Sequence, residues 1–233
     1  MHEAERLGDA YPHATKLNDT EWGYVLDLDF GRPVQWVNND TFLIDTTSPV
    51  LVTATTNCTK LVRAWDYPVY NMTASKSFNS TGKTVDLFLP SSSASFSSIL
   101  VKDQICLAAR LFRSCATDVE FHAIVDSNEA LPDGLNIFGL GPVSETEGPA
   151  FIQALADQGF IEDAIAVVNI VPHKRNWKSS LTLGGIPPEI DGAVRSDWFH
   201  HSYKLKTIEP YTEPIPVLDF TKVIYGNHTL FKS

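Results

Sequence analysis

Short runs of alternating apolar and polar residues predict that most of the chain folds into β-strands. Residues 23–31 read GYVLDLDFG, with an apolar face opposite Asp27 and Asp29, and Gly31-Arg32-Pro33 then turns the chain. Further predicted strands lie at 84–89, 99–107, 118–125, 164–171 and 180–185. Many short strands at this spacing are typical of an all-β sandwich or barrel.

One segment has a helical pattern. In PAFIQALADQG, Pro149 suits the first helical position, and Phe151, Ile152 and Leu155 form one apolar face. Gly159 suits the position after the last turn. We therefore expect one or two short helices in an all-β fold, the clearest of them over 149–158.

The amino-acid composition of the chain changes at two places. Residues 91–98 read SSSASFSS, which predicts a mobile polar hairpin tip or, as the alternative, a plain linker. After Gly185 the chain becomes rich in proline and turn residues, with a predicted strand at 201–207 and a hairpin at 217–231. The second change sets off residues 187–233 as a fragment of a second unit, after an N-terminal extension (1–21) and a β domain (22–186).

Charge and hydropathy exclude two classes of partner. The net charge of -10 and the absence of clustered Lys and Arg argue against a nucleic-acid surface. No window approaches the roughly 20 apolar residues of a membrane span, and residues 1–20 lack the apolar segment of a signal peptide. We expect neither nucleic acid nor a membrane span.

Six Asn-x-Ser/Thr sequons indicate passage through the secretory pathway, and thus a secreted glycoprotein. The alternative is that Asn, Ser and Thr are simply shared turn formers. On either interpretation these stretches are predicted surface loops. The glycosylation candidates are Asn18, Asn39, Asn57, Asn71, Asn79 and Asn227.

The cysteines and histidines do not have the spacing of a metal site. Cys58, Cys106 and Cys115 contain no C-x-x-C motif, and the histidines are scattered apart from His200 and His201. An oxidising compartment would give one disulfide and one remaining thiol, and the spacing leaves all pairings open. We expect no metal and no cofactor.

The most informative polar residue is Asp45, in the stretch FLIDTTSPVLV at 42–52. Apolar residues typical of buried strands lie on both sides of it, which places Asp45 on a tight connection between two strands. A buried carboxylate is costly unless hydrogen bonds or a change of protonation state compensate for it. Asp45 is therefore the first candidate for chemistry.

Several stretches, in this order, resemble the pepsin-like aspartic endopeptidases, especially the fungal secreted type. They are GYVLDLDFG, LIDTTSPVLV, YNMTASKSF, the serine-rich stretch, DQICLA, FHAIV, DGLNIFGLGP, PAFIQALADQGFI and SSLTLGGI, which together cover about residues 22–198. The resemblance implies a lobe of orthogonally packed β-sheets or a barrel, in which Asp45 is the first of two catalytic aspartates. Two such carboxyl groups lie about 3 Å apart and share one proton, so that one activates a water for attack on a peptide bond. A peptide or protein would then lie in the cleft as substrate or ligand.

The loop around Asp45 departs from the family pattern at one position. Thr47 stands where the family has glycine, and its branched Cβ predicts a looser or displaced site. The resemblance still assigns Thr46 a hydrogen bond between the lobes and Ser48 a bond to the Asp45 carboxylate.

Three further departures lie elsewhere in the chain. The flap candidates Leu89, Ser91, Ser92 and Ser93 include no tyrosine. The stretch DGLNIFGLG is two residues longer than the family pattern, which predicts an insertion of Leu135-Asn136 or a bulge. No second Asp-Thr-Gly or Asp-Ser-Gly motif occurs in the 233 residues.

Two functions agree with this pattern. The first is an aspartic endopeptidase homologue that supplies only the first catalytic aspartate and is inactive without a second lobe or another chain. The second is a pepsin-like fold without catalysis that acts as a binding or structural protein.

Overall fold

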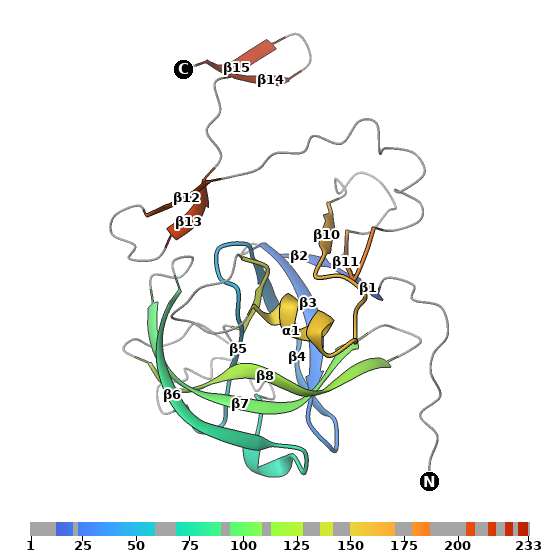
Figure 1. Ribbon diagram of the computed structural model, residues 1–233, viewed down its shortest axis with the longest axis vertical. Coiled ribbons are helices and arrows are strands. Elements are labelled where there is room, and N and C mark those ends of the chain that lie inside the picture. The colour runs from blue at the N-terminus through green and yellow to red at the C-terminus, as the bar shows by residue number, and fades with distance from the viewer. Residues whose placement is uncertain are drawn as a thin grey trace. The chain divides into compact units, whose positions relative to one another are not determined.

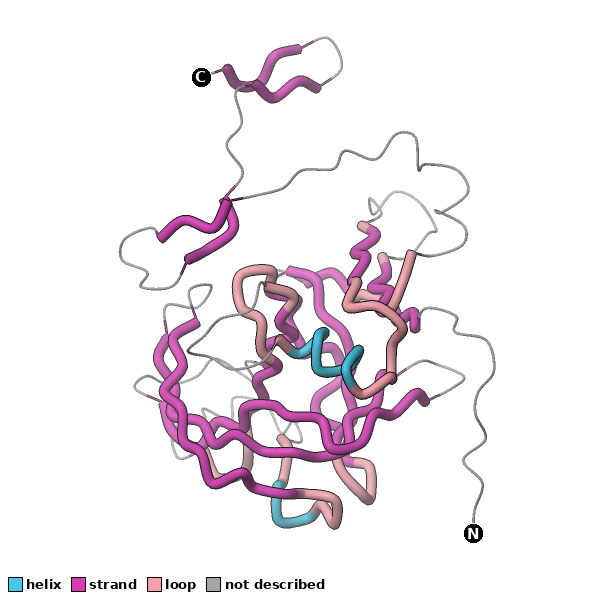
Figure 2. Tube along the Cα trace, viewed as in Figure 1, coloured by secondary structure: helices cyan, strands magenta, loops and turns pink. Residues whose placement is uncertain are grey.

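In the computed structural model, almost every element is a β-strand (Figures 1 and 2). The described residues are 13–20, 23–58, 69–89, 94–108, 113–127, 136–141, 150–170, 179–186, 204–207, 214–217, 222–225 and 228–232. The chain divides into two units, Met1–Arg195 and Ser196–Ser233, which we describe separately. The predicted all-β class is confirmed.

The larger sheet of the first unit has eight strands. They are β2 (Asn18–Thr20), β3 (Gly23–Phe30), β4 (Gln35–Asp45), β5 (Leu51–Ala54), β6 (Asn79–Leu89), β7 (Ala94–Ala108), β8 (Arg113–Ser127) and β9 (Asn136–Gly139). Their order is β2-β3-β4-β9-β5-β8-β7-β6, and β3 also pairs with β7. That extra pairing closes β3, β4, β9, β5, β8 and β7 into a ring, with β2 and β6 attached outside it. Closure satisfies the strand edges that an open sheet would leave unpaired.

A second sheet joins the two ends of the first unit. It contains β1 (His13–Lys16), β10 (Ala166–Asn169) and β11 (Ser180–Leu183) in the order β1-β11-β10, all antiparallel. Residues 13–20 fall within the expected N-terminal extension (1–21), but they supply β1 and β2 to the two sheets. The His13 ring stacks on Phe160, with centroids 4.7 Å apart, and its Nε2 lies 3.0 Å from the Phe160 carbonyl oxygen.

Aromatic side chains fill the centre of the ring of strands. The ring centroid of Phe30 lies 5.5 Å from that of Phe42, 5.4 Å from that of Tyr70 and 5.1 Å from that of Phe121. All four side chains are almost fully buried. They come from β3, β4, β8 and an isolated bridge, so this cluster ties together segments that are distant in sequence.

The predicted helix is confirmed as α1 (Phe151–Asp157), which lies against β8. It buries Phe151, Ile152 and Leu155, and Phe151 packs edge-on to Phe138 of β9 with centroids 5.1 Å apart. Gly159 has a φ of 69°, as expected after a helix end. A second short helix, the 3-10 turn η1 (Met72–Ala74), is capped by Asn71.

The serine-rich hairpin is shorter than predicted at its tip. The last pair of the β6–β7 ladder is Leu89 with Ala94, so residues 90–93 connect the strands and 94–98 belong to β7. Serine fits this strand because its hydroxyl finds partners across the ladder: Ser97 Oγ donates to Asp86 Oδ1 at 2.6 Å, and Ser98 Oγ donates to the Val85 carbonyl at 2.9 Å. The expectation that the whole of 91–98 forms the tip was therefore wrong.

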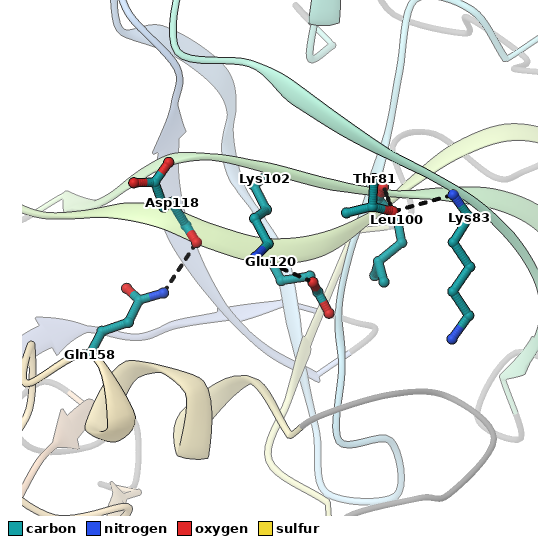
Figure 3. A network of polar contacts seen from close by, with 7 residues as sticks. All are labelled: Thr81, Lys83, Leu100, Lys102, Asp118, Glu120 and Gln158. Atoms are coloured by element: carbon teal, nitrogen blue, oxygen red, sulfur yellow. Dashed lines mark hydrogen bonds and ion pairs between the residues drawn. The ribbon is translucent and has the colours of Figure 1, made fainter.

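A bulge bends β8 next to α1. The pairing of β7 with β8 shifts between Asp103 and Ile105, and Asp118 there has a φ of 57°. Gln158, just past α1, donates from Nε2 to the Asp118 carbonyl at 3.1 Å (Figure 3). The bulge thus turns a strand carbonyl toward the end of the helix.

The second unit contains two hairpins. One is β12 (Lys204–Thr207) with β13 (Pro214–Val217), and the other is β14 (Lys222–Tyr225) with β15 (His228–Lys232). The predicted strand at 201–207 corresponds to β12. Of the hairpin predicted at 217–231, residue 217 pairs with β12, and residues 222–225 and 228–231 lie in β14 and β15; residues 218–221 and 226–227 are outside the described residues.

Candidate functional site

Asp45 is the last residue of β4, and residues 46–50 connect it to β5. The side chain is 5% exposed although it carries a carboxylate. Ser48 is also buried, whereas Thr46 and Thr47 are exposed. The loop thus turns one acid inward and two threonines outward.

Thr47 supplies two hydrogen bonds to the Asp45 carboxylate. Its backbone N–H donates to Oδ1 at 2.7 Å, and its hydroxyl donates to the same oxygen at 2.6 Å. Bonds of this length to a carboxylate oxygen are among the stronger ones in proteins. Thr47, which stands where pepsin-like enzymes have glycine, therefore holds the acid in place. Ser48, which the resemblance assigned to that task, has its Oγ 3.5 Å from the Val50 backbone N–H as an acceptor.

Strand β9 lies behind this loop. It runs parallel to β4, with Asp45 opposite Gly139, and antiparallel to β5, with Leu51 opposite Phe138. The chain from β4 to β5 therefore passes over the end of β9 instead of forming a hairpin. Two residues from the β9 end bond to the loop: the Leu140 N–H donates to the Asp45 carbonyl at 2.7 Å, and the Gly141 N–H donates to the Ser48 carbonyl at 2.8 Å.

Two glycines make this close approach possible. A Cβ on Gly139 would lie 2.4 Å from the Val50 carbonyl oxygen and 2.5 Å from that of Ser48. A Cβ on Gly141 would lie 2.8 Å from the carbonyl carbons of Thr47 and Ser48. Glycine is required at both positions because backbone atoms of the loop occupy the space that a side chain would fill.

Asn136 fixes the far end of β9, which sequence reasoning missed. Its Oδ1 accepts from the Thr53 hydroxyl at 2.9 Å and from the Ala54 N–H at 3.0 Å, and the residue is 1% exposed. The register of β9 with β4 is unbroken over Asn136–Gly139, so the predicted bulge does not occur within these residues. A polar residue entering an apolar run was the signal that could have identified this role.

A second buried acid lies in a separate polar cluster. Asp103 of β7 is fully buried. Its carboxylate accepts hydrogen bonds from the Tyr70 hydroxyl at 2.5 Å, from the backbone N–H of the neighbouring Gln104 at 2.7 Å, and from the Ser77 hydroxyl. Burial, and then the hydrogen bond and charge of Asp103, raise the pKa of Tyr70 far above its usual range. This cluster fixes the segment 69–78 to β7, and no sequence motif pointed to it.

The other predicted site residues are partly outside the described part. Leu89 ends β6, while Ser91, Ser92 and Ser93 lie outside the described residues, so the flap prediction is not placed. A small pocket is lined by Val50, Leu51, Leu100, Glu120, Phe121 and His122. Asp45 is not among these residues, so the pocket does not mark a cleft at the acid.

The described residues contain neither a group of metal-binding side chains nor a membrane-spanning helix. No three or more His, Cys, Asp or Glu side chains among them are grouped to hold a metal ion. No helix among them is long and apolar enough to cross a membrane.

The sequence left the disulfide pairing undetermined, and in the structure Cys106 is bonded to Cys115. They face each other across β7 and β8, with Cα atoms 4.0 Å apart, and the thiol of Cys58 is buried outside this bond. Gln104 Nε2 donates to Cys106 Sγ at 3.2 Å, and Arg32 Nε donates to Gln104 Oε1.

Comparison of the sequence with models of known protein families finds no match, and comparison with curated proteins finds none either. The resemblance to pepsin-like enzymes therefore depends on the order of the motifs quoted above. The geometry of the Asp45 loop is independent of that resemblance.

Proposed function

We propose that this chain is an aspartic-endopeptidase-type half-site that supplies Asp45 and is inactive without a second acid. The observation that carries the proposal is the buried Asp45 carboxylate, held by Thr47 in a loop that β9 supports from behind. Such a loop fixes both the position and the orientation of an acid. Peptide hydrolysis by activated water requires that control.

We place the second carboxyl group outside these 233 residues, because no second Asp-Thr-Gly or Asp-Ser-Gly motif occurs in them. Two acids about 3 Å apart cannot both be charged, so they share a proton and alternate as base and acid. Asp103 does not fit that task, because Tyr70, Ser77 and Gln104 already donate to its two oxygens. One acid on its own cannot complete the proton cycle.

The test uses the chain with an affinity tag in its native cell, so that a partner is purified with it. Hydrolysis of a denatured protein at acidic pH is measured for the tagged wild type and for Asp45→Asn. We expect activity in the wild-type preparation, none in Asp45→Asn, and none in wild-type chain purified from a host that lacks the partner. Equal activity of the two native preparations, or none in either, would contradict the proposal.

The second candidate is a binding protein without catalysis, and the hydroxyl of Thr47 favours it. That hydroxyl occupies an acceptor site on Asp45 that glycine would leave open. Native preparations without hydrolytic activity, but with a retained protein or glycan ligand, would support this candidate.

We also propose that the chain passes through the secretory pathway. The cross-strand disulfide and the exposed sequon residues Asn57 and Asn79 support this localisation. Fractionation of the native cell and its medium tests it, and a purely cytosolic signal would contradict it.

A further inference from the structure

The described sequon asparagines differ in what the fold does with them. Asn71 is half-buried, and its Oδ1 accepts from the N–H of Thr73 at 3.1 Å and from its hydroxyl at 2.8 Å. Its backbone is held as well: Gln35 accepts from the Asn71 N–H and donates to the Asn71 carbonyl, both at 2.9 Å. A glycan on Asn71 would have to be accommodated inside this clamp.

Asn79 is in the opposite situation. It is the first residue of β6, its side chain is exposed, and that side chain makes no hydrogen bond to any described residue. Ser80 and Thr81, which complete the sequon, are exposed too. The folded protein therefore has room for a bulky group on the Asn79 amide.

The strand at this sequon is fixed without the Asn79 side chain. The Thr81 hydroxyl donates to the Leu100 carbonyl at 2.7 Å and accepts from the Lys83 N–H at 3.3 Å (Figure 3). The local backbone thus keeps its geometry whether or not Asn79 is modified.

The position of β6 in the sheet indicates a role for a glycan on Asn79. Among the described strands, β6 is the last of the eight-stranded sheet, so one of its edges has no partner strand. An edge of this kind is a template for pairing with another chain, and proteins protect such edges with charge, shape or a cover. The exposed face of residues 79–84 is polar but has one charge, that of Lys83.

We propose that Asn79 is an N-glycosylation site whose glycan covers the β6 edge, whereas Asn71 is left unmodified in the folded protein. The inference rests on the proposed secretory route. The donor is a lipid-diphosphate-linked oligosaccharide. A bond forms between Asn79 Nδ2 and C1 of the first sugar, the C1–O bond to phosphate breaks, and the electron pair leaves with the lipid diphosphate. One Nδ2 proton passes to a base of the transferring enzyme.

The test imposes secretory entry by placing a secretion signal before the full chain in a glycosylating eukaryotic host. Secreted wild type, Asn79→Gln and Asn71→Gln are compared on gels, and each sequon is scored by mass spectrometry after enzymatic deglycosylation in oxygen-18-labelled water, which converts a glycosylated Asn to a labelled Asp. We expect the Asn79 peptide to carry the isotope label and the Asn71 peptide to lack it. Asn79→Gln should lose one glycan's mass relative to wild type, and Asn71→Gln should lose none.

An unlabelled Asn79 would overturn the site, and a labelled Asn71 in monomeric protein would overturn the selection. The cover is tested by sedimentation, where Asn79→Gln should self-associate more than Asn71→Gln. Equal monomer fractions would overturn the covering role. Because the added signal imposes entry, these failures are distinct from failure of the proposed localisation, which the native cell tests.

Discussion

At the scale of single residues, two of the buried carboxylates, Asp45 and Asp103, are held in different ways. Asp45 sits on a loop and takes two bonds from one neighbouring residue, Thr47. Asp103 sits inside a strand and takes bonds from three different residues. The first arrangement depends on a local turn, and the second depends on segments brought together by the fold.

The contribution of the Thr47 hydroxyl can be isolated by Thr47→Val, which keeps the branched shape and the backbone N–H. Loss of a hydrogen bond to a carboxylate at this exposed position should lower the free energy of unfolding by about 1 kcal/mol. The measurement is urea unfolding at neutral pH. Thr46→Val is the matched control, since Thr46 is exposed and bonds to no described residue, and it should change little. Equal effects of the two changes would contradict the assigned role.

Tyr70 should make the fold sensitive to alkali. Its pKa is raised in the folded state, so below the ordinary tyrosine pKa of about 10 its contribution to stability is complete, and above it the contribution is lost as the unfolded chain ionises. Unfolding free energies measured from pH 8 to 11 should therefore fall above about pH 10 in wild type. The fall should be smaller in Tyr70→Phe, while Tyr24→Phe should retain it. An identical pH profile for Tyr70→Phe and wild type would contradict this assignment.

Asp45 could be identified from the sequence, but its hydrogen-bond partner could not: Ser48 was predicted, and Thr47 is found. The acid was visible because a charge between apolar runs is rare. The role of Thr47 was missed because a branched residue in place of glycine suggests crowding, whereas here it points outward and its hydroxyl turns back. Asp103 could not be identified, since its partners Tyr70 and Ser77 are distant in sequence and only the fold brings them to β7.

At the scale of elements, the site depends on how closely β9 approaches the Asp45 loop. Gly139→Ala would place a Cβ against the backbone of Ser48 and Val50, and should cost about 3 kcal/mol through forced movement of the loop. Gly82→Ala is the control, because Gly82 has a φ of 73° but open space around it, and it should cost only about 1 kcal/mol. Thermal or urea unfolding measures both. A smaller effect at Gly139 than at Gly82 would show that the loop is not tightly supported.

The bulge in β8 makes a second prediction. Asp118 has a left-handed φ of 57°, which Asp tolerates and a β-branched residue does not. Asp118→Val should therefore destabilise the protein by about 1–2 kcal/mol. Thr117→Val, at the exposed neighbouring position, should be close to neutral, and comparison of the two urea midpoints checks the assignment. A neutral Asp118→Val would mean that the strand relaxes without cost.

Most elements could be predicted because their periodicity is local. The alternation in 23–30 and the apolar face of 151–155 follow from short-range sequence. The inclusion of residues 13–20 was missed because strands this short carry little pattern, and pairing with β11 and β3 decides their structure. The serines of 95–98 were misassigned because composition suggested a loop, while cross-strand hydrogen bonds allow a strand.

At the scale of the whole molecule, the disulfide acts mainly on the unfolded chain. It joins residues separated by nine positions, and closing a loop of that size should stabilise the fold by about 2–3 kcal/mol. The double variant Cys106→Ala with Cys115→Ala should lose that amount in urea unfolding. Reductant should shift the wild-type midpoint and leave that of the double variant unchanged. A shift in both would show that the reductant acts elsewhere.

The all-β class was accessible from the sequence, but the closure of the ring was not. Closure depends on β3 pairing with β7, a contact between distant segments that no local pattern specifies. The number of short strands indicated a sandwich or a barrel. Only the pairing order distinguishes these two architectures.

The threading of β9 between β4 and β5 also has a consequence for biosynthesis. The ribosome synthesises β4 and β5 well before Asn136–Gly139. The edges of β4 and β5 that pair with β9 therefore remain unpaired until β9 is synthesised. Over that interval the nascent chain presents two apolar strand edges, which are binding sites for chaperones. The acid-bearing turn is thus synthesised well before the strand that supports it, and it takes its final form only once that strand has arrived.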